Sequence, residues 1–269
     1  MDTLARHRVS VAGPEDGQPM VFAHGFGCDQ TMWRHVAPAF ADRHLVVTFD
    51  YIGSGGSDLS AYNSRKYADL WGYAADVLEI VRELDLNDVV FVGHSVSAMI
   101  GALAVIEAQE RFDKLVMVGP SPRYIDDVDY AGGFSREDID ELLESLESNY
   151  LGWSSTMAPM IMGNPERPGL GQELTASFCR MDPAIARRFA MTTFLSDNRQ
   201  DLPRIGVPTL VLQCTNDVIA PTAVGAYVAS AVPDGTLVHL AATGHCPNLS
   251  APEETITAIS DFLRRRETA

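Results

Sequence analysis

The chain has 269 residues, a mass of 29.3 kDa and a formal charge of −16, from 20 basic and 36 acidic side chains. This acidic balance argues against a surface for nucleic acid or anionic membranes, since both need basic patches. With no apolar run near the ~18 residues of a membrane span, no signal-peptide pattern and four scattered cysteines, we expect a cytoplasmic protein with free thiols.

Strand and helix patterns alternate along residues 1–120. Strands are predicted at 7–11, 19–23, 45–49, 88–92 and 114–118, the first two as a pair joined through a turn, and a helix is predicted over 67–86. This alternation is typical of an α/β fold, with a mainly parallel sheet and helices on both faces.

The alternation stops between residues 121 and 196, where helices are predicted at 137–150, 153–162 and 182–195. Strand patterns resume at 207–213 and 236–240. We therefore expect a core of residues 1–120 and 197–269, with a helical lid insertion at 121–196. Apolar side chains of this insertion either line a pocket or only pack the lid onto the core: Phe134, Trp153, Met157, Met160, Ile161, Phe189 and Phe194.

The segment Gly93-His94-Ser95-Val96-Ser97 stands between a predicted buried strand and an apolar helical stretch. A serine at such a corner, with small residues two before and two after it, matches the nucleophile elbow G-x-S-x-G except for the final serine. The alternative is an ordinary serine that caps a helix. We interpret Ser95 as a nucleophile because the rest of the chain supplies partners for it.

A serine nucleophile needs a base and an acid, which in this class of fold follow it in the order acid, histidine. Asp217 follows the strand at 207–213, and His245 follows the strand at 236–240. We predict that Asp217 holds the tautomer of His245 that accepts the Ser95 proton. Taken alone, Asp217 also fits the role of a helix cap. The other histidine of this region, His239, lies within its strand and is interpreted as structural.

A second loop offers donors for the oxyanion that acyl transfer creates. His24-Gly25-Phe26-Gly27 follows the strand at 19–23, and its glycines leave the backbone free to orient an amide. We predict that the backbone N–H groups of Phe26 and Val96 form an oxyanion hole. His24 is interpreted as a structural residue of this loop rather than as a second base.

These motifs lie within a longer pattern that resembles the α/β-hydrolases containing the bacterial stress-response regulator RsbQ and the plant karrikin and strigolactone receptors, which are butenolide hydrolases. The matching segments are His24-Gly25-Phe26-Gly27 with Asp29-Gln30 and Trp33, residues 91–101, Ser121-Pro122-Arg123-Tyr124, Gly132-Gly133-Phe134, Asn149-Tyr150 with Trp153, and Gly244-His245. The bias of two lysines against eighteen arginines favours a bacterial member.

The resemblance implies the α/β-hydrolase fold and a triad of Ser95, Asp217 and His245, with no cofactor or metal. It also implies pocket walls at Phe26, Phe134, Trp153 and Phe194; Met157 stands where relatives carry an aromatic residue, which makes that wall softer. The implied activity is hydrolysis of small hydrophobic carboxylic esters or butenolide-type lactones. The alternative is a ligand sensor with slow or single-turnover hydrolysis that recruits a regulatory partner such as a phosphatase.

Overall fold

A mostly parallel sheet forms the centre of the computed structural model, which describes residues 2–264. Its seven strands lie in the order β1-β3-β2-β4-β5-β6-β7. They are β1 (Ser10–Ala12), β2 (Gln18–Ala23), β3 (His44–Thr48), β4 (Val89–His94), β5 (Phe112–Val118), β6 (Thr209–Asn216) and β7 (Gly235–Thr243). The inner strand β4 is buried at every position, as its run of valine and phenylalanine predicts.

Every pairing in this sheet is parallel except that of β1, which runs antiparallel to β3 with Val11 opposite Val47. The sequence analysis wrongly paired the first two strands with each other. In the sheet, β3 lies between β1 and β2, although it follows both in the sequence. This order depends on contacts between segments that are distant in sequence. The expected α/β class, with a mainly parallel sheet, is confirmed.

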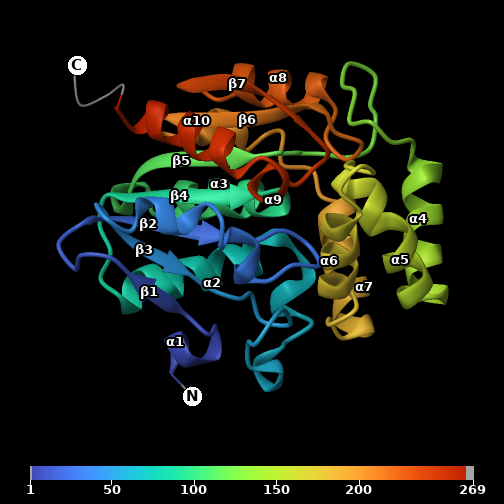
Figure 1. Ribbon diagram of the computed structural model, residues 1–269, viewed down its shortest axis with the longest axis horizontal. Coiled ribbons are helices and arrows are strands. Elements are labelled where there is room, and N and C mark those ends of the chain that lie inside the picture. Colours follow the sequence, from blue (N-terminus) through green and yellow to red (C-terminus); the bar gives the residue numbers. More distant parts are fainter. Residues whose placement is uncertain (1, 265–269) are drawn as a thin grey trace.

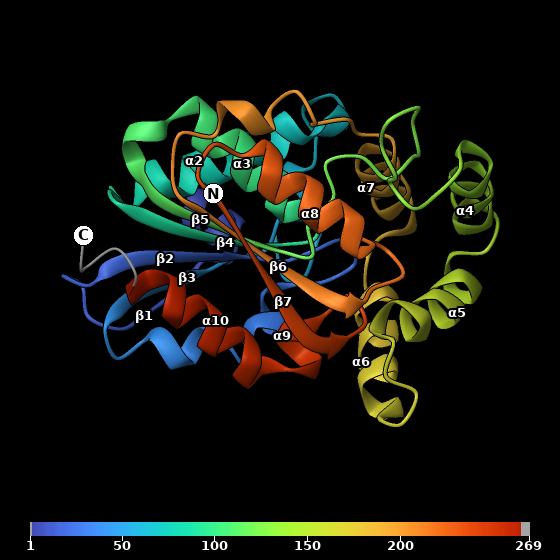
Figure 2. The ribbon, with the colours of Figure 1, turned by 90° about the horizontal axis from the view of Figure 1, so that it is seen from above.

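Helices cover both faces of the sheet, as Figures 1 and 2 show. On one face α3 packs against β4 and β5, α2 packs against α3, and α8 packs against β6 and β7; α10 contacts β6 and β7 from the other face. The bounds are α1 (Thr3–Arg6), α2 (Leu70–Glu83), α3 (Val96–Glu107), α8 (Thr222–Ala231), α9 (Pro247–Ser250) and α10 (Pro252–Arg264). Short 3₁₀ turns are η1 (Gln30–Trp33), η2 (Ala37–Phe40), η3 (Leu59–Ala61), η4 (Lys66–Ala68), η5 (Gln109–Arg111) and η6 (Leu202–Arg204).

Four helices form the stretch between β5 and β6, and they stand together at one end of the sheet (Figure 1). They are α4 (Arg136–Ser148), α5 (Tyr150–Met162), α6 (Pro168–Phe178) and α7 (Pro183–Phe194). The sequence analysis missed α6, whose first four residues contain a proline and two glycines. We call residues 121–196 the insertion. No helix in residues 2–264 is both long and apolar enough to span a membrane.

The corner between β4 and α3 is the sharp turn on which the position of Ser95 depends. Ser95 has φ 57° and ψ −123°, a left-handed conformation that non-glycine residues rarely adopt. A Cβ atom added to Gly93 would lie 2.3 Å from the carbonyl oxygen of Ser97, which is backbone and has no freedom to move aside. The corner therefore requires glycine at position 93.

We expect Gly93→Ala to lower the free energy of unfolding by about 2 kcal/mol or more, because the new methyl group collides with backbone. Gly169→Ala, in α6, is the matched control. Nothing lies within 4 Å of a Cβ at that site, so the change should be neutral or stabilise by about 0.5 kcal/mol. Chemical denaturation measures both, and equal stabilities for the two variants would contradict this account of the corner.

Candidate active site

Ser95, His245 and Asp217 come from three strand ends and meet in one hydrogen-bonded chain. Ser95 Oγ lies 2.7 Å from His245 Nε2, and His245 Nδ1 lies 2.7 Å from Asp217 Oδ2. All three residues are buried. The carboxylate accepts the Nδ1 proton, so the lone pair of Nε2 faces the serine hydroxyl and is able to accept its proton.

The loop after β6 holds Asp217 ionised and in place. Its Oδ1 accepts hydrogen bonds from the amides of Ile219 at 2.8 Å and Ala220 at 3.0 Å, which leaves Oδ2 for the imidazole. Burial by itself would raise the pKa of Asp217, but His245 and the two amides outweigh it, so the pKa lies below its ordinary value. Asp217 is thus an acceptor of fixed charge and orientation. Because its Oδ2 bonds to His245, it does more than cap a helix.

The loop that carries His245 is fastened to the insertion and to the elbow. The amide of His245 donates to the carbonyl of Ile161, near the end of α5, at 2.8 Å. The carbonyl of His245 accepts a hydrogen bond from His94 Nε2 at 2.7 Å. Burial lowers the pKa of His94 to about 3, so this ring stays neutral and acts as a fixed donor. Sequence reasoning missed this role of His94, which stands at one of the two variable positions of the elbow motif.

The two amides proposed for the oxyanion hole come from the elbow and from the loop after β2. Val96 is the first residue of α3, so its N–H lies outside the helical ladder of hydrogen bonds. The loop that carries Phe26 runs against the elbow, since a Cβ on Gly25 would lie 3.3 Å from Ser95 Cβ. Ser97 ties the two segments together by donating its hydroxyl proton to the carbonyl of His24. The serine at 97 therefore has a contact that glycine would lack.

His24 stabilises this loop with both ring nitrogens. Its Nε2 accepts the amide proton of Tyr51 at 3.1 Å, and its Nδ1 donates to the carbonyl of Gly25 at 2.9 Å. The residues that follow are held by α6 and the turn after it. Ser177 Oγ donates to the carbonyl of Gly27 at 2.9 Å, and Arg180 pairs with Asp29 at 2.8 Å. The loop beside Ser95 is thus braced from the core and from the insertion.

A cavity of about 30 Å³ adjoins Ser95 between the core and the insertion. It is lined by Phe26, Cys28, His94, Ser95, Tyr124, Ile161, Leu174, Phe178, Thr193, Phe194, Ile219, His245 and Cys246. None of these carries a carboxylate, ammonium or guanidinium group. Burial raises the pKa of the Cys28 thiol to about 12, and that of Cys246 is raised as well, so both thiols stay protonated and unreactive.

The predicted pocket walls divide between the cavity and the layer behind it. Phe26 and Phe194 line the cavity, whereas Phe134, Trp153 and Met157 are not among its lining residues. Trp153 stacks on the lining residue Phe178, with 5.7 Å between ring centroids and 12° between planes. It therefore supports the wall from behind, and Phe134 and Met157 pack against the hydrophobic core.

Two lining residues escaped the sequence analysis as site residues. Tyr124 is buried and lines the cavity together with Ser95. The signal was the Ser121-Pro122-Arg123-Tyr124 motif, which follows β5 directly. Phe178 was missed because α6, the helix that carries it, was not predicted.

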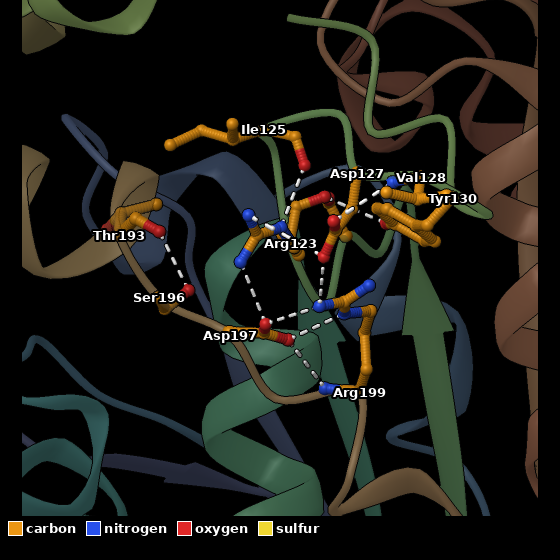
Figure 3. Close-up of polar contacts among 10 residues, drawn as sticks. Arg123, Ile125, Asp127, Val128, Tyr130, Thr193, Ser196, Asp197 and Arg199 are labelled. Atoms are coloured by element: carbon orange, nitrogen blue, oxygen red, sulfur yellow. Dashed lines mark hydrogen bonds and ion pairs between the residues drawn. The ribbon is translucent and has the colours of Figure 1, made fainter. Parts of the chain in front are cut away.

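The two ends of the insertion are joined by a cluster of ion pairs, which Figure 3 shows. Arg123 pairs with Asp197 at 2.8 Å, and Arg199 reaches Asp197 at 2.7 Å and Asp127 at 2.9 Å. The guanidinium of Arg199 also lies over the ring of Tyr130, 5.1 Å from its centroid. We call these four charged residues the neck cluster. It fixes the segment next to Tyr124 and the segment after α7 relative to one another.

One group in residues 2–264 has the composition of a metal site, and it lies outside the cavity. Ligand atoms of His7, Asp76 and Glu79 lie within 4.8 Å of one another. The ammonium of Lys66 already forms ion pairs with both carboxylates, 3.2 Å from Glu79. A protein cation therefore occupies the position that a metal would need.

Comparison with known proteins places this geometry in a family. The model of the alpha/beta hydrolase family matches residues 20–258. A karrikin insensitive 2 receptor of Petunia hybrida is 39% identical over 254 residues, 94% of each chain. A strigolactone esterase of Arabidopsis thaliana is 37% identical over 258 residues, which cover 96% of this chain and 94% of that protein.

A solved structure shows the same agreement in three dimensions. A hydrolase from Oleispira antarctica superposes with a TM-score of 0.95 at 38% identity, over 98% of this chain and 97% of that one. The likeness therefore includes the helices of the insertion as well as the sheet. The chain belongs to the α/β-hydrolase family, in the group that includes the karrikin and strigolactone receptors.

Proposed function

We propose that the protein is a serine hydrolase of small hydrophobic carboxylic esters or butenolide-type lactones, with Ser95, His245 and Asp217 as its triad. The observation that carries this proposal is the unbroken hydrogen-bonded chain from Ser95 Oγ through His245 to Asp217, with 2.7 Å at each step. The Ser95 end of this hydrogen-bonded chain lies at a cavity with an apolar wall. A nucleophile, a base and an orienting acid in this arrangement are what acyl transfer requires.

The reaction proceeds through an acyl-enzyme. Ser95 Oγ attacks the ester carbonyl carbon while its proton passes to His245 Nε2, and the amides of Phe26 and Val96 bind the resulting oxyanion. Collapse of this intermediate breaks the bond to the leaving oxygen, which takes the proton from His245. Water, deprotonated by His245, then attacks the acyl carbon. The bond from this carbon to Ser95 Oγ breaks, Oγ takes the proton back from His245, and the acid is released. In a lactone the leaving oxygen stays attached, so the product is a ring-opened hydroxy acid.

The cavity favours a small uncharged substrate. Its lining offers no charged side chain to pair with a carboxylate or amine of the substrate, and burying an unpaired charge is costly. Its volume of about 30 Å³ is far below the roughly 300–1,000 Å³ of a ligand pocket. Side chains or the insertion must therefore move when an ester enters.

A second function, that of a ligand sensor, is favoured by the same need for movement. Relatives are named receptors as well as esterases. The end of α5 holds the loop of His245 through the Ile161 carbonyl, so displacement of the insertion would reach the catalytic base. In this function, binding or slow turnover of a lactone changes the insertion, which then engages a regulatory protein partner.

Ser95→Ala and His245→Gln should each lower ester turnover by roughly 10⁴- to 10⁶-fold, because either change removes a member of the triad. His239→Gln is the matched control, since His239 lies exposed in β7. Hydrolysis of p-nitrophenyl acetate and the midpoint of thermal unfolding measure activity and folding. A folded Ser95→Ala variant with activity within tenfold of the unchanged protein would refute the triad.

Short acyl chains should react faster than long ones, because the walls of the cavity close around Ser95. We expect kcat/KM for p-nitrophenyl butyrate to exceed that for the dodecanoate by about tenfold or more, as overpacking by a few methylene groups costs on the order of 1–3 kcal/mol. Phe194→Ala should reduce this difference by opening the wall. Dodecanoate as the best substrate would contradict the enclosed pocket.

The sensor function predicts a change in the insertion on ligand binding. A covalent serine-directed ligand or a tight lactone should alter hydrogen exchange in residues 121–196 more than in the sheet, since those residues must move to admit it. Hydrogen-exchange mass spectrometry, with Ser95→Ala as the control for the covalent ligand, measures the effect. Equal changes of hydrogen exchange in the sheet and in the insertion would contradict the sensor function and leave an esterase without a signalling role.

A further inference from the structure

The cavity contains one polar side chain that neither the triad nor its supports use. Thr193, near the end of α7, lines the cavity and is 2% exposed. Its hydroxyl has no hydrogen-bond partner within residues 2–264. A buried hydroxyl without a partner costs roughly 1–3 kcal/mol, so its retention in an otherwise apolar wall calls for an explanation.

Other hydroxyl side chains in the insertion show how such a group is normally satisfied. Ser154, Thr156 and Thr175 each donate to the carbonyl four residues earlier in their helices, at 2.8, 3.1 and 2.9 Å. The neighbouring Thr192 donates to the carbonyl of Tyr67 at 3.2 Å. Thr193 differs from all of these, although it lies in the same kind of helix.

The other polar side chains of the cavity lie close to the triad. Tyr124 stands beside Ser95 in the lining, and His94 Nε2 donates to the carbonyl of His245. His94 Nδ1 also has no partner within the described chain, but it lies against Gly25, where a Cβ would approach to 2.6 Å. The hydroxyl of Thr193 is thus a buried group of the lining whose missing hydrogen bond a ligand is able to supply.

The helix end that carries Thr193 is held in place. Its carbonyl accepts a hydrogen bond from Ser196 Oγ at 2.8 Å, and the chain then enters the neck cluster at Asp197 (Figure 3). The amide of Asn198 also donates to the carbonyl of Pro122 at 2.7 Å. These contacts fix the backbone, so Thr193 keeps its place in the wall of the cavity.

We propose that Thr193 is a specificity-determining residue whose hydroxyl binds a second oxygen of the substrate, an ether, ring or carbonyl oxygen separate from the ester group under attack. The ligand class is then short oxygen-bearing esters and lactones rather than simple alkyl esters. A site built to bind an oxygen disfavours the analogue that lacks it, since the hydroxyl is again left unpaired. This inference rests on the proposed hydrolase function and extends it to substrate choice.

The test compares substrates that differ by one atom. p-Nitrophenyl methoxyacetate and p-nitrophenyl butyrate have acyl chains of equal length, with an oxygen replacing one methylene group; 3-methoxypropionate and pentanoate extend the comparison by one carbon. The ratio of kcat/KM within each pair is measured for the unchanged protein and for Thr193→Val. Intrinsic reactivity cancels when these ratios are compared between variants.

We expect Thr193→Val to lower the ratio of oxygen-bearing to alkyl ester by roughly five- to tenfold in at least one pair, the range of one hydrogen bond. The midpoint of thermal unfolding should hold or rise, because an unpaired hydroxyl is replaced by a methyl group. Thr193→Ser should restore the ratio. The matched control Thr192→Val should lower the midpoint, since it removes the bond to Tyr67, and leave both ratios unchanged.

A second measurement separates this inference from the proposed function. In the Ser95→Ala background, thermal shifts caused by ethyl methoxyacetate and ethyl butyrate report binding without turnover, and Thr193→Val should remove the advantage of the first. Unchanged ratios in an active enzyme, or equal thermal shifts with and without Thr193→Val, would overturn the role of Thr193. Absence of ester hydrolysis by the unchanged protein would instead refute the proposed function, while the thermal shifts still decide the role of Thr193.

Discussion

The strained backbone at Ser95 is the constraint on which the arrangement of the site depends. A positive φ at a serine costs on the order of 1–3 kcal/mol, and it persists because the surrounding structure leaves no relaxed alternative. The amide of Ser95 donates to the carbonyl of Val118 in the neighbouring strand at 2.8 Å. On the other side, the backbone of Ser97 fills the space above Gly93. Strand pairing and helix packing together therefore hold the hydroxyl above the sheet.

The insertion supports the chemistry as well as covering it. Two of its segments bond to two parts of the site, Ile161 to the loop of His245 and Ser177 to the loop of Phe26, and Tyr124 lines the cavity beside Ser95. A displacement of these helices would therefore change the support of His245 and of the loop of Phe26 at once. Under the proposed function, this coupling would serve both turnover and signalling, since ligand entry and the geometry of the candidate triad depend on the same helices.

The electrostatics of the site fix the protonation state of the groups around Ser95. Asp217 is held ionised by its amide donors and by His245, while burial keeps His94 neutral and Cys28 protonated. The neighbours of Ser95 are therefore fixed donors or acceptors rather than competing bases and nucleophiles. In the proposed mechanism, His245 is the group that carries a proton between Ser95 and the leaving oxygen.

The sequence by itself determined the α/β class, and it predicted the insertion and the candidate triad, because strand and helix patterns and the residues that follow each strand are local features. Parallel strands bring their carboxyl ends to one edge, so Ser95, Asp217 and His245 could be predicted to meet there. The pairing of β1 with β3, the helix α6 with its Phe178, and the placement of Trp153 behind the cavity depended on tertiary structure. So did the place of Tyr124 beside Ser95 and the unpaired hydroxyl of Thr193. Each of these results from packing between segments distant in the chain, and even the motif that contains Tyr124 does not indicate which residue its side chain will meet.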